Sequence, residues 1–270
     1  MVLDSVLKEA INVINVSKEN VFFHSSGSNG YQMKFVKDDL FLKASAIIRH
    51  KEVKDHLVEK IASDIAEDLD IPCVRQDICI IDYDGLIMNG VKSKNFNKEG
   101  IEYVPFRSFL DFNRKSFIEE QMIKCSTVNK IALCSQVVSD CCEITKEEYN
   151  KYLIECAIID CLVGNVDRHL KNFGLFVKGD KYSVPLIFDN GMGMFENDPY
   201  KDSYKTLDDA YCYLYINPYG EDPFDMIDIL LSEYDLKRYD FTKIKEPKEF
   251  PSDLAKIYFD KMLNYILRRY

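Results

Sequence analysis

Residues 164–172 read GNVDRHLKN, and residues 185–189 read PLIFD. These two stretches place Asn172 five positions after Asp167 (172 − 167) and a second carboxylate, Asp189, 22 positions after Asp167 (189 − 167). An Asp and an Asn at this spacing can bring a proton acceptor and a metal-binding amide onto one turn of the chain. Oxygen ligands from a few side chains suit Mg²⁺. The ordered set therefore predicts a site for phosphoryl transfer.

The size and composition of the chain fit a soluble globular protein. Its 270 residues are 47% hydrophobic and 30% charged, which allows one large domain or two small lobes. The formal net charge of −10 argues against nucleic acid as a direct partner, because nonspecific affinity for nucleic acid depends on Lys and Arg. No run reaches the ~18 apolar residues of a membrane span, and the N-terminus lacks a secretion signal. We therefore expect a cytoplasmic protein without a membrane partner.

The first part of the chain, residues 1–110, has the pattern of strands around one helix. Apolar alternation predicts a hairpin of strands at 31–36 and 40–44 with a turn at 37–39, and further strands at 77–82 and 86–91. Apolar residues at helical spacing from Val53 to Leu69 predict a helix that ends before Pro72. These residues are expected to form a small β-rich lobe that binds a nucleotide.

Residues 111–270 have mostly helical patterns. Thr145 and Glu148 form the sequence signature of a capping box, and Gly164 is placed to end the same helix, so that the helix leads into the 164–172 stretch. A hairpin of strands at 173–177 and 182–188 would then deliver Asp189. Helices are also expected at 223–234 and 252–270. The whole pattern predicts an α+β fold with a small β-rich N-terminal lobe and a larger helical C-terminal lobe.

The three polar residues of the opening stretches have distinct expected roles. Asp167 would accept the proton of an acceptor hydroxyl, a role usually worth ~10²–10⁴ in rate. Asn172 and Asp189 would hold Mg²⁺ against the phosphates. The alternative interpretation is structural: Asp167 and Asn172 would cap turns, and Asp189 would form a surface ion pair.

Two charged residues of the first lobe extend the expected site. Lys43 ends an apolar strand, and Glu59 follows 16 positions later (59 − 43) on the predicted helix. A strand Lys paired with a helix Glu is how kinases fix the α- and β-phosphates of ATP. The alternative is that both residues are solvated surface charges.

A loop before the Lys43 strand is the candidate phosphate-binding segment. Its backbone N–H groups and two glycines would let the main chain approach phosphates closely. It matches neither the Walker pattern nor the full G-x-G-x-x-G loop, and an ordinary turn is the alternative. The nucleotide-binding residues expected here are Gly27, Ser28, Asn29 and Gly30.

Together these motifs resemble those of HipA-like kinases, the bacterial Ser/Thr kinase family of persistence toxins, in a compact form. Residues 164–173 are similar to the family's G-N-x-D-R-H-x-x-N-[FW], and residues 185–189 are similar to its P-[VL]-x-D segment. The loop at 26–30, Lys43 and Glu59 resemble its phosphate loop, its nucleotide lysine and its helix Glu. The D-R-H-x-x-N order is also similar to that of phosphoinositide 3/4-kinases.

The resemblance implies a two-lobed protein-kinase-like fold with ATP and Mg²⁺ in the cleft and adenine contacted near residues 90–94. It implies transfer of the γ-phosphoryl group of ATP to a Ser or Thr hydroxyl of a protein, including this chain itself. A regulatory protein partner is a further expectation. The antitoxin contacts of full-length toxins are not carried over, because the compact form lacks their additional N-terminal subdomain.

Two other functions stay open on the sequence alone. A catalytically silent nucleotide-binding or scaffold module would explain the loosely matched glycine loop. A kinase for a lipid or another small molecule would share the D-R-H order, although the sequence lacks a basic amphipathic face for a membrane. The acceptor is not named by these motifs, because acceptor choice depends on the surface around the cleft.

Overall fold

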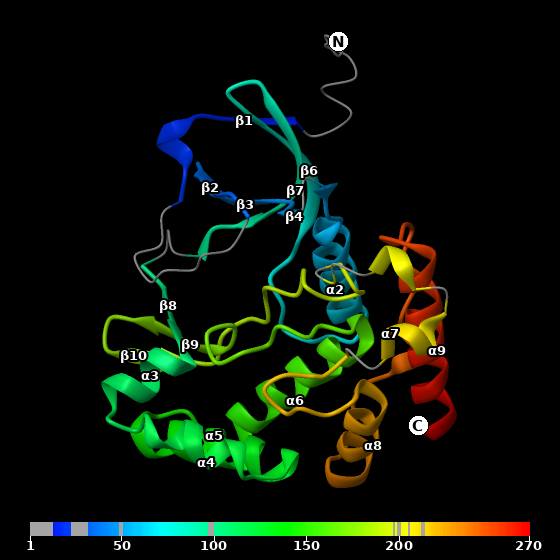
Figure 1. The fold of residues 1–270 in the computed structure, drawn as a ribbon. Coiled ribbons are helices and arrows are strands. Elements are labelled where there is room, and N and C mark those ends of the chain that lie inside the picture. The colour runs from blue at the N-terminus through cyan, green and yellow to red at the C-terminus, as the bar shows by residue number, and fades with distance from the viewer. Residues whose placement is uncertain are drawn as a thin grey trace.

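The structure is a computed structural model, and it describes residues 13–22, 32–48, 51–96, 100–196, 198, 201–204, 206–211 and 214–270. The predicted two-lobed α+β architecture is present: a curled sheet forms the N-terminal lobe, and helices dominate the C-terminal lobe (Figure 1). Among the described residues, no helix is both long and apolar enough to cross a membrane.

The N-terminal lobe is built on a five-stranded sheet with the order β1-β6-β7-β3-β2. The predicted hairpin is present, with β2 and β3 antiparallel and Asp38 at φ 53° in the turn between them. The two further predicted strands are present as β6 and β7, which pair antiparallel. The strands span Val13–Val16 (β1), Lys34–Lys37 (β2), Leu40–Ala44 (β3), Asp77–Tyr83 (β6) and Leu86–Lys94 (β7). A short 3₁₀ helix, Lys18–Asn20, follows β1, and a two-stranded hairpin joins β4 (Ile47–Ile48) to β5 (Lys51–Glu52).

The two faces of this sheet differ in chemistry, because side chains alternate between faces along a strand. Phe35 and Leu42 lie opposite each other in the β2–β3 ladder, and both are buried in the apolar cluster of this lobe. Lys43 is therefore directed to the other face. Gly90 lies opposite Ala44 in the β3–β7 ladder, and a Cβ at Gly90 would lie 2.6 Å from the Lys43 carbonyl oxygen. A glycine is thus required where β7 packs against the strand that carries Lys43.

Helix α2 (Asp55–Asp68) connects the sheet to the second lobe. It contacts β6 and β7 on one side and α6 on the other, and Figure 1 shows it between the sheet and the helices below. Its apolar stripe is buried as the periodicity predicts. Glu59 is buried on this helix, and a buried carboxylate requires a charged or hydrogen-bonding partner.

The C-terminal lobe contains a three-stranded sheet, β10-β9-β8, and most of the helices. β8 precedes the predicted lobe boundary at residue 110 and α3 crosses it, yet β8 pairs with β9 and α3 packs on the same sheet. The strands are Glu102–Pro105 (β8), Gly174–Lys178 (β9) and Lys181–Ser183 (β10). The helices are Phe106–Phe112 (α3), Phe117–Ile123 (α4), Thr127–Cys141 (α5), Lys146–Val163 (α6), Leu207–Tyr211 (α7), Pro223–Glu233 (α8) and Asp253–Arg269 (α9), with 3₁₀ turns at Lys201–Ser203 and Phe241–Lys243.

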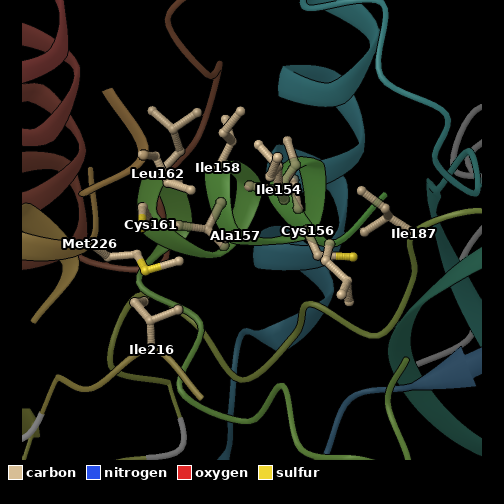
Figure 2. Packing of buried hydrophobic residues seen from close by; sticks show 14 of the residues in the cluster. Ile154, Cys156, Ala157, Ile158, Cys161, Leu162, Ile187, Ile216 and Met226 are labelled. Carbon is tan, nitrogen blue, oxygen red and sulfur yellow. The ribbon is translucent and has the colours of Figure 1, made fainter. Parts of the chain in front are cut away.

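Helix α6 is the centre of this lobe, and local signals fix both of its ends. Thr145 Oγ1 accepts from the Glu148 N–H at 3.2 Å, and Glu148 Oε2 accepts from the Thr145 N–H at 2.8 Å, so the predicted capping box is present. Gly164 ends the helix at φ 61°, in the left-handed region that glycine favours. Figure 2 shows apolar side chains from several elements around α6. Most residues of α6 are buried, as is typical of a helix that is apolar on all sides.

The predicted strand at 182–188 is wrong in its length. β10 ends at Ser183, two residues before Pro185, which has no N–H for a sheet ladder. The chain instead runs beside residues 72–74: the Ile187 N–H donates to the Pro72 carbonyl at 3.1 Å, and the Val74 N–H donates to the Ile187 carbonyl at 2.8 Å. Ile187 is buried in the core around α6 (Figure 2). Core packing, and not a hairpin, therefore places the segment that leads to Asp189.

Candidate active site

The structure brings Lys43, Glu59 and Asp189 together across the two lobes. The Lys43 ammonium lies 2.6 Å from Glu59 Oε1 and also forms an ion pair with Asp189 Oδ1. Burial alone would lower the pKa of Lys43, but the carboxylates of Asp189 and Glu59 outweigh burial and raise this pKa, so Lys43 is a cation. Burial likewise opposes ionisation of Asp189, and Lys43 outweighs it and holds the pKa of Asp189 below its usual range.

Asp189 stands on a specialised turn that docks on α2. Its φ of 62° is uncommon for a residue with a side chain. The next N–H, that of Asn190, donates to Glu59 Oε2 at 3.1 Å, so Glu59 binds Lys43 with one oxygen and this turn with the other. A Cβ at Gly191 would lie 3.2 Å from Glu59 Oε1. A small residue after Asn190 therefore lets the turn approach α2 closely.

The 164–172 stretch forms a loop in which Asp167 and Asn172 lie side by side. The Asn172 amide nitrogen donates to the Asp167 carbonyl at 2.8 Å and approaches Asp167 Oδ2 at 3.4 Å. The Asp167 N–H in turn donates to Asn165 Oδ1 at 3.2 Å. Because the amide nitrogen of Asn172 is used within the loop, its amide oxygen is oriented away from these bonds. This geometry fits the expected role of the oxygen as a metal ligand.

The ionisation of Asp167 is perturbed in the direction that suits a proton acceptor. Partial burial raises the pKa of Asp167, and the nearby Asp189 carboxylate adds to the rise, while His169 and Lys43 oppose it. A carboxylate with a raised pKa is a stronger base than one at its ordinary value. His169 itself is half exposed, and its Nδ1 accepts a hydrogen bond from the Lys171 N–H at 3.2 Å, within the loop.

Arg168 links the loop to the segment that carries Asp189. Its guanidinium binds both carboxylate oxygens of Asp160 on α6, at 3.0 and 2.9 Å. It also donates to the carbonyls of Asn172 and Phe188, at 2.9 and 2.7 Å, and to Asn190 Oδ1 at 2.5 Å. Burial alone would lower the pKa of Arg168, and Asp160 reverses this and raises it. One buried cation therefore fixes Asn172 relative to Asp189.

Two members of this network, Asp160 and Asn190, were not among the predicted site residues. Asp160 is the one charged residue in the otherwise apolar run 156–163 of α6, and that isolation was an available signal. Asn190 carries no comparable signal, because its role depends on contacts with segments distant in sequence.

Two expectations concern the nucleotide side of the site. Gly27, Ser28, Asn29 and Gly30 lie outside the described residues. The first described residue after them, Gln32, hydrogen-bonds through its side-chain amide to Asp55 on α2. Residues 90–94, implied to contact adenine, lie within β7, and the connection between lobes begins after Lys94.

The site's ligand set for a metal is small. Within the described ranges, no three His, Cys, Asp or Glu side chains are grouped so as to hold a metal ion. Asp189 and the amide oxygen of Asn172 would supply two ligands. Mg²⁺ is commonly held by one or two carboxylates together with phosphate oxygens of the substrate, so this pair fits that ion.

Comparisons with known proteins place this geometry in a kinase fold. No family model matches the sequence, and no curated protein matches it. The structure is similar to that of the proinflammatory kinase CtkA from Helicobacter pylori, with a TM-score of 0.59 and 17% identity over 95% of this chain and 98% of that chain. A chain of the HipA, HipB and operator DNA complex of a Shewanella oneidensis toxin–antitoxin system gives a TM-score of 0.44 and 12% identity, over 92% of this chain and 62% of that chain. The predicted kinase fold is confirmed by the first similarity.

Proposed function

We propose that this chain is an ATP- and Mg²⁺-dependent kinase that phosphorylates Ser or Thr hydroxyls of a protein, with its own hydroxyls among the acceptors. The observation that carries the proposal is the convergence of the Lys43–Glu59–Asp189 contacts with the Asp167–Asn172 loop. These residues lie on separate segments. Arg168 fixes the two C-terminal segments, which end at Asn172 and Asp189, relative to each other. A structural ion pair alone would not require a base loop beside it.

Each residue has a defined task in the proposed reaction. Lys43 would bind the α- and β-phosphates, with Glu59 orienting its ammonium. Asn172 and Asp189 would hold Mg²⁺, which neutralises charge on the phosphate oxygens. Asp167 would accept the proton of the acceptor hydroxyl. As it does so, the hydroxyl oxygen bonds to the γ-phosphorus, and the bond between the γ-phosphorus and the departing ADP oxygen breaks. The products are ADP, the phosphorylated acceptor and a proton that leaves from Asp167.

The test is incorporation of label from γ-labelled ATP into a generic protein acceptor and into the chain itself. Asp167→Asn should lower the rate by ~10²–10⁴ while ATP binding is retained, because the base acts on the acceptor and not on the nucleotide. Asp180→Asn is the matched control, since Asp180 is exposed in the β9–β10 turn. Full activity in Asp167→Asn would contradict the assignment of the base.

The same assay, combined with thermal unfolding in the presence of ATP, separates the other candidate functions. Stabilisation of the wild-type chain by ATP without any transfer would indicate a nucleotide-binding module. Transfer to a lipid or another small molecule, and not to proteins, would replace the acceptor class while leaving the phosphate chemistry intact.

A further inference from the structure

A second lysine of the N-terminal lobe, Lys34, lies beside Lys43 on the same face of the sheet. The β2–β3 ladder pairs Lys34 directly with Lys43. Residues directly opposite in an antiparallel pair point to the same face, with Cβ atoms about 4.5–5.5 Å apart. The adjacent pair, Phe35 and Leu42, is on the other face and is buried in the apolar cluster. Lys34 is thus directed toward the site, as Lys43 is.

Two like charges at this spacing destabilise a sheet unless other groups compensate them. Lys43 is compensated by direct contacts with Glu59 and Asp189. For Lys34, the described part of the chain contains no hydrogen bond or ion pair to its ammonium. It is half-buried, and burial lowers its pKa, with Asp189 the charged group that opposes this most. Lys34 is therefore a half-buried lysine beside Lys43 that lacks a direct partner within those ranges.

We propose that Lys34 is a second phosphate-binding residue of the site and contacts the polyphosphate of the nucleotide from β2. The inference rests on the proposed function, because it takes a nucleoside triphosphate as the ligand. Lys34 stands four positions after Gly30 (34 − 30), at the base of the expected phosphate loop. An ammonium is a compact point charge that binds phosphate oxygens without a fixed geometry, so its stem can adapt to the ligand.

The charges of the site favour this role over a purely structural one. Glu59 and Asp189 face two lysines: Lys43 pairs directly with both carboxylates, and Lys34 is a second, more distant counter-charge of Asp189. A divalent ion held by Asp189 would take over this neutralisation. The Lys34 ammonium would then be available to the phosphates, which bring negative charge to the same place.

The two roles differ in how the effect of a substitution depends on the ligand. If Lys34 contacts phosphate, its substitution should lower the affinity more for ligands that carry more phosphates. If Lys34 is only a structural counter-charge, its substitution should lower the affinity for every ligand equally. Lys34→Met keeps the length and apolar character of the stem. It should weaken Mg²⁺–ATP binding by about 10- to 100-fold, the effect of one charge-assisted hydrogen bond. Binding of adenosine should be unchanged, and binding of AMP should change less than that of ATP.

The experiment is calorimetric titration of wild-type and variant chains with ATP, ADP, AMP and adenosine in Mg²⁺. Lys37→Met is the matched control, because Lys37 is on the same strand but the opposite face, where its ammonium donates to the Asn15 carbonyl. Lys34→Arg should retain most of the affinity. A urea titration of each variant checks that it is folded.

The outcomes separate this inference from the proposed function. If wild type binds ATP and Lys34→Met binds it equally well, or loses ATP and adenosine affinity equally, Lys34 is not a phosphate ligand and the proposed function stands. If wild type binds no adenine nucleotide, both the proposed function and this inference are wrong.

Discussion

The buried cation Arg168 allows the sharpest test of how the site is held together. Its side chain is 2% exposed and donates to five acceptors, two of them on the Asp160 carboxylate. Arg168→Met removes the charge but keeps much of the stem. Breaking a buried pair by removing one partner costs about 3–5 kcal/mol, because the other charge is left uncompensated. Against a total stability of about 5–15 kcal/mol for a typical domain, this is a large loss.

The measurement is urea unfolding followed by circular dichroism, with Arg107→Met as the matched control. Arg107 is 48% exposed and pairs with Asp111 at 3.8 Å and with Glu119. Its replacement should change the free energy of unfolding by no more than about 1 kcal/mol, because exposed ion pairs contribute little. The midpoint should fall sharply for Arg168→Met, at an unchanged slope.

A second substitution separates the lost charge from the lost packing. Adding Asp160→Asn to Arg168→Met removes the uncompensated carboxylate and should recover part of the stability, as a coupling of about 1–3 kcal/mol. Equal losses for Arg168→Met and Arg107→Met, or a double variant in which the two losses simply add, would refute the reasoning.

Three further changes test the framework around the site. Gly193→Ala should lower the free energy of unfolding in urea by about 1–3 kcal/mol, because its Cβ would lie 2.5 Å from the Val163 carbonyl oxygen; wild-type stability would contradict this. Thr145→Ala should cost about 0.5–2 kcal/mol in the same assay through loss of the helix cap, and no change would show that the cap is dispensable. Burial raises the pKa of Glu155, although its carboxylate accepts a hydrogen bond from Tyr239. Wild type should therefore lose stability relative to Glu155→Gln as the pH rises from about 4.3, the pKa in the unfolded chain, through the raised pKa in the folded chain. Parallel stability profiles of the two proteins from pH 4 to 7 would exclude this.

The parts of the fold that could be predicted are those with local causes. The capping box at Thr145 and the stop at Gly164 act within a few residues, so the sequence was sufficient to place both ends of α6. The β2–β3 hairpin and the α2 stripe depend on simple periodicity in the same way. The motif spacing also indicated which polar residues the structure would bring together around Lys43.

The parts that could not be predicted depend on contacts between distant segments. Alternation suggested a strand up to residue 188, but Pro185 lacks an N–H, and Ile187 pairs with residues near 73 instead of continuing the hairpin. The pairing of β8 with β9 is likewise a contact between distant segments, and it places residues 102–105 in the sheet of the second lobe. The pairing of Arg168 with Asp160 is a further contact that only the fold shows.

The two halves of the candidate site are held by different means, and this difference assigns a controlling position to α2. Arg168 fixes Asn172 relative to Asp189 entirely within the C-terminal lobe. Lys43 reaches Asp189 from the other lobe, and Glu59 is the group that contacts both sides, with Oε1 on Lys43 and Oε2 on the Asn190 N–H. A shift of α2 would disturb both bonds, because both oxygens belong to one carboxylate. The alignment of Lys43 with the C-terminal half of the site therefore depends on where α2 lies, whereas the geometry around Asn172 does not.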